Sequence, residues 1–205
     1  IPGQGVLDWL CLGSPESWEL QDRFTDYSLD ESKLFPFVLS GETIDKAFYD
    51  FINSYLDEAG SDGVVRLAAA NLNYTFFRFE QTDERYEDGS GSYKLRLLKR
   101  TKSRPPETGF GVIPDASHSG EKIGIMASVK PSNAGAKPVV GEIVKCLAVR
   151  TRNQYDARLA ELAQLTSETQ AANAAIQYGR RLRRFVMFIF RIADDRGRKI
   201  DDYDL

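Results

Sequence analysis

Two residues that can exchange protons lie in turn-like segments of this sequence. Asp62 lies in "SDGVV" (61–65), directly before an apolar run, and His118, the single histidine among 205 residues, lies in "PDASHSG" (114–120). A carboxylate that orients an imidazole through one ring nitrogen lets the other nitrogen act as a general base. Asp62 and His118 are therefore the candidate catalytic residues, and a nucleophile is the missing third member.

Structural roles are also open for these residues. Ser-Asp-Gly is a common turn composition, so Asp62 is alternatively a turn residue only. Histidine tolerates many environments, so His118 is alternatively a surface or hydrogen-bonded loop residue. Asp45 is the runner-up acid because it lies just after an apolar segment. An acidic residue in the first turn of a helix, however, already has a role in meeting the positive end of the helix dipole.

The candidate residues must be positioned by alternating strands and helices. The segment 33–42 is a short apolar run typical of a buried strand in a parallel sheet, and Thr43 is a suitable N-cap for the apolar 3.6-residue pattern that follows. The run after Asp62 fits either a strand or a helix. The sequence predicts, in order, a strand at 33–42, a helix between the N-cap Thr43 and Gly60, a β-hairpin at 74–99, a short strand at 110–114 and helices at 138–149 and 154–178.

Taken together, these segments resemble the C-terminal part of bacterial α/β-hydrolase lipases and phospholipases. "SDGVV" is similar to their acid-bearing segment, "PDASHSG" to their histidine loop, and "FPFVLSG" (35–41) to the strand that precedes them. "LCLGSPESWEL" (10–20) is similar to the segment that follows their lid. The resemblance implies a catalytic triad in which Asp62 orients His118.

The expected fold class is therefore α/β, the C-terminal portion of an α/β-hydrolase fold with a parallel sheet, flanking helices and an inserted β-hairpin. Residues 1–150 would form the lid segment and the C-terminal half of the hydrolase domain, 151–184 a helical linker, and 185–205 the beginning of a truncated β-sandwich-like domain. The sequence starts with Ile-Pro-Gly and stops in a strand-like stretch, so we expect a fragment of a longer protein.

The nucleophile that the resemblance implies is absent from the sequence. Lipases of this kind hold their serine in a Gly-x-Ser-x-Gly turn, and this pentapeptide does not occur in the 205 residues. "GSGS" (89–92) lies in a polar turn without a strand and a helix beside it. The chain order nucleophile, acid, histidine therefore places the serine upstream of Ile1. The implied reaction is serine-dependent hydrolysis of a carboxylic ester of a lipid or phospholipid.

Partners follow from the same resemblance. We expect a lipid or ester substrate and the N-terminal half of the hydrolase. Similarity to secreted antibacterial lipase effectors adds a neutralising partner protein, and export without a cleaved signal peptide to act at membranes. The alternative is a non-catalytic protein-interaction module with a β-rich tail. Aromatic residues of the first segment are candidates for a lid or for lipid contact, namely Trp9, Trp18, Phe24 and Tyr27.

Composition excludes several other classes. A formal net charge of -3 gives no field that would attract nucleic acid, so no nucleic-acid partner is expected. Cys11 and Cys146 lie far apart without metal-ligand spacing, and no phosphate-loop or metal-protease motif occurs, so neither a metal nor a cofactor is expected. The most apolar run, 185–190, is much shorter than the roughly 20 residues of a membrane span, which predicts a soluble chain.

Overall fold

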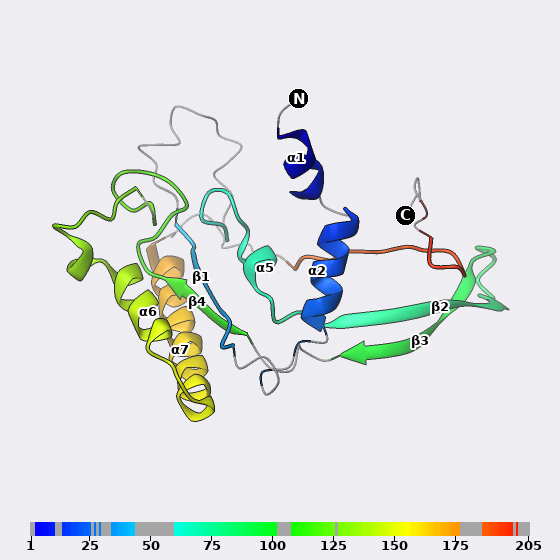
Figure 1. Cartoon of the computed structure of the whole chain (residues 1–205). Helices are drawn as coiled ribbons and strands as arrows, with labels where there is room; N and C mark the ends of the chain where they lie inside the picture. Colours follow the sequence, from blue (N-terminus) through cyan, green and yellow to red (C-terminus); the bar gives the residue numbers. More distant parts are fainter. Residues whose placement is uncertain are drawn as a thin grey trace. The chain divides into compact units, whose positions relative to one another are not determined.

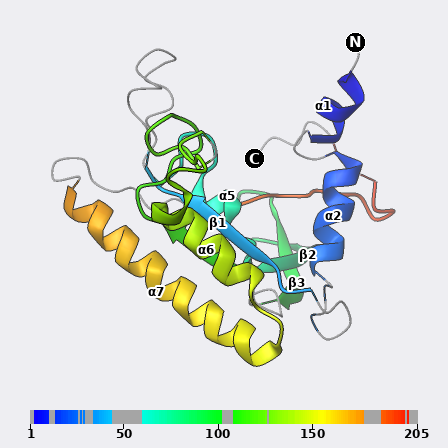
Figure 2. The same cartoon turned by 60° about the vertical axis from the view of Figure 1, so that its left-hand side comes forward.

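The computed structural model describes ten stretches of the chain, which are 3–10, 14–25, 27, 29, 34–43, 60–101, 108–125, 127–176, 186–198 and 200. The chain divides into two compact units. The first combines 1–27 with 186–205, and the second covers 28–185. The second unit is a mixed α/β structure in which helices pack against a small parallel sheet (Figures 1 and 2). The helix predicted between Thr43 and Gly60 lies outside the described residues.

The parallel sheet consists of two strands that are far apart in sequence. Strand β1 (Phe37–Gly41) pairs in parallel with β4 (Gly109–Ile113), in a register that runs from Phe37 opposite Gly109 to Gly41 opposite Ile113. This pairing confirms the parallel strands that the apolar runs predict. Because the strands are parallel, their C-terminal ends lie at the same edge, and the segments that follow them meet there.

Helix α7 (Arg152–Ile176) covers β4 and also hydrogen-bonds to the sheet. Tyr155 and Leu162 are fully buried on its inner face. The Tyr155 hydroxyl donates to Pro36 O at 3.0 Å, before β1, and Thr166 Oγ1 accepts a hydrogen bond from Val112 N of β4 at 3.0 Å. Side chains of α7 therefore satisfy backbone groups that another strand would otherwise pair.

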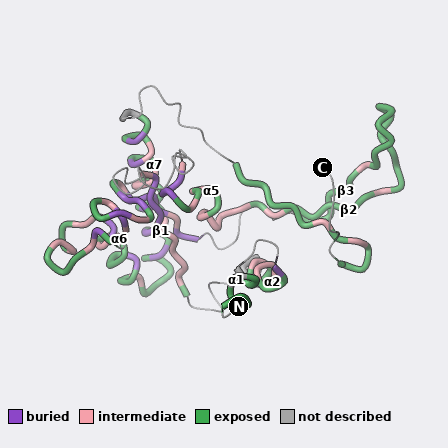
Figure 3. Tube along the Cα trace, turned by 90° about the horizontal axis from the view of Figure 1, so that it is seen from above, coloured by how far each residue is buried: buried purple, intermediate pink, exposed green. Residues whose placement is uncertain are grey.

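Helix α6 (Pro138–Leu147) closes the core over the histidine-bearing segment. Proline at its start suits the first helical turn, where its missing N–H has no intrahelical partner. Val139 packs with Ile113 and Ala116 in the buried cluster. Figure 3 shows that the buried residues gather around β1 and α7, while the hairpin between β1 and β4 is largely exposed.

The described residues between β1 and β4 include a short helix and a β-hairpin. The run after Asp62 forms the short helix α5 (Leu67–Ala70), and the predicted hairpin is confirmed as β2 (Phe76–Arg85) paired antiparallel with β3 (Tyr93–Thr101). The base of the hairpin is held by Asn73, which accepts from Thr108 N and donates to Thr108 O, both at 2.7 Å. The base of the hairpin is therefore tied to the residue directly before β4.

The first unit contains two helices and an extended C-terminal segment. Helix α1 (Gln4–Leu10) is followed by α2 (Pro15–Thr25), whose first turn is capped by Ser14 Oγ, 3.1 Å from Ser17 N. At the start of the β-rich domain expected over 185–205, residues 186–192 are not in a strand, and Ala193 is in a single β-bridge. After the turn that follows this segment, Ile200 N donates a hydrogen bond to Ile192 O at 3.1 Å. A pair of strands requires a continuous series of such hydrogen bonds. The β-rich domain expected from residue 185 stays a prediction.

A buried ion pair joins α6 to α7. Arg158 of α7 is only 4% exposed, and its guanidinium contacts the carboxylates of Glu142 and Glu161. Lys145 Nζ lies 2.8 Å from the other oxygen of Glu142. Burial raises the pKa of Glu142, but hydrogen bonds from Lys145 and Arg158 outweigh burial and hold that pKa below its ordinary value. The pair therefore favours the charged carboxylate.

Among the described residues, none of the helices combines the length and the apolar character that a membrane span requires.

We expect Arg158→Met to destabilise the second unit by about 3 kcal/mol, because it removes one of the two counter-charges of the partly buried Glu142. Urea unfolding followed by circular dichroism measures the loss. The matched control is Arg152→Met on the same helix, whose ion pair with Asp156 is half exposed. The control should cost less than about 1 kcal/mol. Equal losses in the two variants would contradict the role of the buried pair.

We also expect the stability to depend on Glu142 in acid. Its pKa is lower in the folded chain than the ordinary value of 4.5, so the unfolded chain binds the proton more readily. The contribution is present above pH 4.5 and is lost as the pH falls through the folded pKa. Urea midpoints measured at several pH values should show a smaller acid loss in Glu142→Gln than in the unsubstituted chain. Parallel pH profiles would contradict this assignment.

Candidate active site

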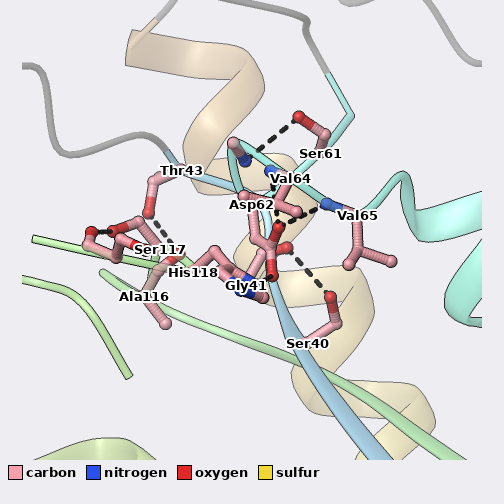
Figure 4. A network of polar contacts seen from close by, with 12 residues as sticks. Ser40, Gly41, Thr43, Ser61, Asp62, Val64, Val65, Ala116, Ser117 and His118 are labelled. Atoms are coloured by element: carbon pink, nitrogen blue, oxygen red, sulfur yellow. Dashed lines mark hydrogen bonds and ion pairs between the residues drawn. The ribbon is translucent and has the colours of Figure 1, made fainter. Parts of the chain in front are cut away.

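Asp62 and His118 come together at the C-terminal edge of the parallel sheet. His118 lies five residues after the end of β4, and Asp62 lies in the turn between 60 and 66 (Figure 4). Nδ1 of His118 is 3.3 Å from Oδ2 of Asp62. The two segments also share a backbone hydrogen bond, from His118 N to Asp62 O at 2.7 Å. The structure therefore brings together the two residues that the sequence singles out.

The Asp62 carboxylate has a separate partner for each oxygen. Oδ1 accepts hydrogen bonds from Val64 N at 3.0 Å and Val65 N at 2.7 Å, while Oδ2 faces the imidazole. Gly63 has a φ of 98°, a left-handed conformation that glycine adopts without strain. Asp62 is thus a turn residue and a partner of His118 at the same time.

Burial differs sharply across the pair. The side chain of Asp62 is 6% exposed, whereas that of His118 is 47% exposed. A buried carboxylate opposite Nδ1 favours the tautomer with the proton on Nδ1, which leaves Nε2 as the basic nitrogen. Since the ring is half exposed, a substrate or a further residue has room to approach it. The arrangement suits proton transfer at Nε2.

The histidine loop is held by backbone contacts on both sides of His118. Ser117 is fully buried; its N–H donates to Ile123 O at 2.9 Å, and its carbonyl accepts from Ile125 N at 2.8 Å. The loop also lies tightly against the end of β1. A Cβ placed on Gly41 would lie 2.0 Å from Ala116 O, so glycine is required at this position.

Sequence reasoning missed two contributors to this loop. Gly41 is one, since its role depends on the close approach of Ala116. Thr43 is the other, because its Oγ1 donates to Ala116 O at 2.7 Å, and the helix that it is predicted to cap lies outside the described residues. A threonine directly after a buried strand carries the signal of a polar contact at the strand end, but the sequence does not identify the acceptor.

The remaining candidates lie elsewhere. Asp45, the runner-up acid, is outside the described residues. The four aromatic residues proposed for a lid all belong to the first unit: Trp9 is exposed, Trp18 lies under the guanidinium of Arg191 at 5.2 Å, Phe24 lies in α2, and Tyr27 is partly buried. Their contact with lipid stays a prediction. In the described part of the chain, no three His, Cys, Asp or Glu side chains are grouped to hold a metal ion.

We expect Gly41→Ala to disturb the histidine loop, because its new methyl group would overlap backbone atoms of Ala116 that cannot rotate away. The expected cost is roughly 1–3 kcal/mol in the free energy of unfolding, typical of overpacking in a tight core. Gly141→Ala, in α6, is the control because a Cβ there meets nothing within 4 Å. It should be neutral or stabilise by up to about 1 kcal/mol. Chemical denaturation compares the two, and a stable Gly41→Ala would contradict the close approach.

Comparisons with known proteins found similarity among solved structures. No protein-family model and no curated protein matches the chain. Among solved structures, the chain is similar to phospholipase PlaB from Legionella pneumophila in complex with thio-NAD, with a TM-score of 0.76 and 37% sequence identity. A second structure of phospholipase PlaB from the same organism matches with a TM-score of 0.73 and 36% identity.

Both matches cover 97% of this chain, which spans 42% and 41% of the two PlaB chains. The similarity therefore extends over nearly all of this sequence and over less than half of the phospholipase.

Proposed function

We propose that this chain supplies the acid and the histidine of a catalytic triad in a serine-dependent carboxylic ester hydrolase that acts on phospholipid or a related lipid. The observation that carries the proposal is the contact between buried Asp62 Oδ2 and Nδ1 of half-exposed His118 at the edge of a parallel sheet. Ligand sites in α/β proteins lie at this kind of edge. Because both similar structures are phospholipases, phospholipid is the substrate class.

The reaction follows from the arrangement of the pair. His118 Nε2 takes the proton from a serine hydroxyl as the serine oxygen attacks the ester carbonyl carbon. The imidazole then returns this proton to the departing alcohol oxygen, and an acyl-serine remains. Water attacks the acyl-serine in the second half of the reaction, again with His118 as base. Asp62 stays charged throughout and stabilises the protonated imidazole.

The serine is proposed to lie upstream of Ile1, in the part of the hydrolase that precedes this chain. Support comes from the sequence, in which the Gly-x-Ser-x-Gly turn does not occur, and from the PlaB chains, of which this chain covers 42% and 41%. The same proposal makes the parallel pair β1 and β4 the C-terminal part of an α/β-hydrolase sheet.

We expect His118→Gln and Asp62→Asn to abolish ester hydrolysis in the complete hydrolase that carries this chain. In known triads, loss of the acid that sets the tautomer lowers kcat by about 10⁴-fold and loss of the base by about 10⁶-fold. Release of p-nitrophenol from a p-nitrophenyl ester, and of fatty acid from phosphatidylcholine vesicles, measures the loss. KM should change little, since neither side chain is proposed to hold the ester in its ground state.

Asp115→Asn is the matched control. Asp115 is an exposed acid three residues before His118 with a φ of 48°, and asparagine adopts this left-handed conformation as readily as aspartate. The control should keep its activity within about twofold, because its carboxylate has no part in the proposed proton transfer. Full activity in His118→Gln would contradict the proposed catalytic triad and favour the alternative, a non-catalytic protein-interaction module.

A further inference from the structure

The backbone on both sides of His118 is fixed by contacts from three different parts of the chain. His118 N donates to Asp62 O, and Ser117 exchanges backbone hydrogen bonds with Ile123 and Ile125. The carbonyl of Ala116, two residues before the histidine, accepts from Thr43. The first two contacts are between main-chain atoms, whereas the third depends on a side chain and can be removed by substitution.

Thr43 binds the Ala116 carbonyl through two atoms. Its Oγ1 donates at 2.7 Å and its N–H donates to the same oxygen at 3.3 Å (Figure 4). Ala116 is 3% exposed, so its carbonyl has lost most of its access to water. Removing the hydroxyl would leave this buried carbonyl with only the longer bond from the Thr43 N–H, and weakening a buried hydrogen bond costs free energy.

The residues directly before Thr43 are held by contacts with α7 and with the histidine loop. Glu42, directly before it, is 7% exposed, and its carboxylate accepts from Asn173 Nδ2 at 3.1 Å and from Gln170 Nε2 at 3.5 Å, both on α7. Gly41, before Glu42, is packed against Ala116. The end of β1 is therefore tied to α7 on one side and to the histidine loop on the other.

The turn before His118, which Thr43 contacts, includes a residue in a left-handed backbone conformation. Asp115, next to Ala116, has a φ of 48°, which a residue with a side chain adopts at a cost in energy. The surrounding contacts must therefore hold this turn in place. The turn also sets the direction in which the chain enters His118, whose Nδ1 lies 3.3 Å from Asp62 Oδ2.

We propose that Thr43 is a positioning residue for His118: its hydroxyl, held in place through Glu42 by α7, fixes the Ala116 carbonyl and thereby keeps the imidazole opposite Asp62. This role rests on the proposed function, since it matters for hydrolysis only if His118 is the base. Small displacements of a catalytic group cost large factors in rate. Thr43 thus acts on kcat through His118 without touching the substrate.

The test compares Thr43→Val, which keeps the shape of the side chain but removes its hydroxyl, with Thr43→Ser, which keeps the hydroxyl. In the complete hydrolase, Thr43→Val should lower kcat for a p-nitrophenyl ester roughly tenfold or more with KM unchanged, and Thr43→Ser should stay within about threefold. Thr43→Ala provides a second hydroxyl-free variant if Thr43→Val does not fold, as judged by circular dichroism.

A spectroscopic measurement separates positioning from general destabilisation. Imidazole ¹⁵N signals distinguish the two neutral tautomers, and the signals that disappear in His118→Gln belong to His118. The share of the tautomer with the proton on Nδ1 should fall in Thr43→Val and be restored in Thr43→Ser, although both variants remain folded. Equal tautomer populations and equal kcat in the two variants would overturn the positioning role.

The two proposals fail in different ways. If His118→Gln abolishes hydrolysis while Thr43→Val matches Thr43→Ser, the positioning role alone is wrong. If His118→Gln hydrolyses the ester at the full rate, the proposed function is wrong, and the positioning role for the reaction fails with it.

Discussion

The parallel pairing of β1 with β4 is the constraint on which the rest of the site depends. The two strands, which end at Gly41 and begin at Gly109, pair in a register that runs from Phe37 opposite Gly109 to Gly41 opposite Ile113. Only a parallel arrangement brings the segments after both strands to the same edge. Thr43 and the histidine loop meet there, and Asp62 reaches the same edge from the segment between β1 and β4.

Helix α7 does more than cover the sheet. Its inner face carries polar side chains that bond to main-chain or carboxylate groups of the sheet region: Tyr155 to Pro36, Thr166 to Val112 and Asn173 to Glu42. Buried polar groups of this kind require partners in fixed positions, so they specify one seating of the helix more narrowly than apolar contacts do. These bonds hold both ends of β1 against α7, and the candidate site lies at the C-terminal end of β1.

The sequence allows the short strands, the hairpin and the Asp62–His118 pair to be predicted, because these depend on local patterns or residue types. Buried parallel strands are continuous apolar runs, and the hairpin has aromatic strands with a polar turn. The Thr43 contact spans 73 positions and the Glu42 contact 131, so no local pattern contains them. The described residues 186–192 are not in a strand, although their composition favours one.

The two oxygens of the Asp62 carboxylate have different partners, and this affects how substitutions at this position are interpreted. One oxygen organises the local backbone and the other faces the imidazole, so a single replacement changes the loop geometry and the contact with His118 together. The loss of rate in any one variant is then a sum of two unrelated effects. A double-mutant cycle with His118 isolates the coupling between the two side chains, because the cost of reorganising the turn cancels in the cycle.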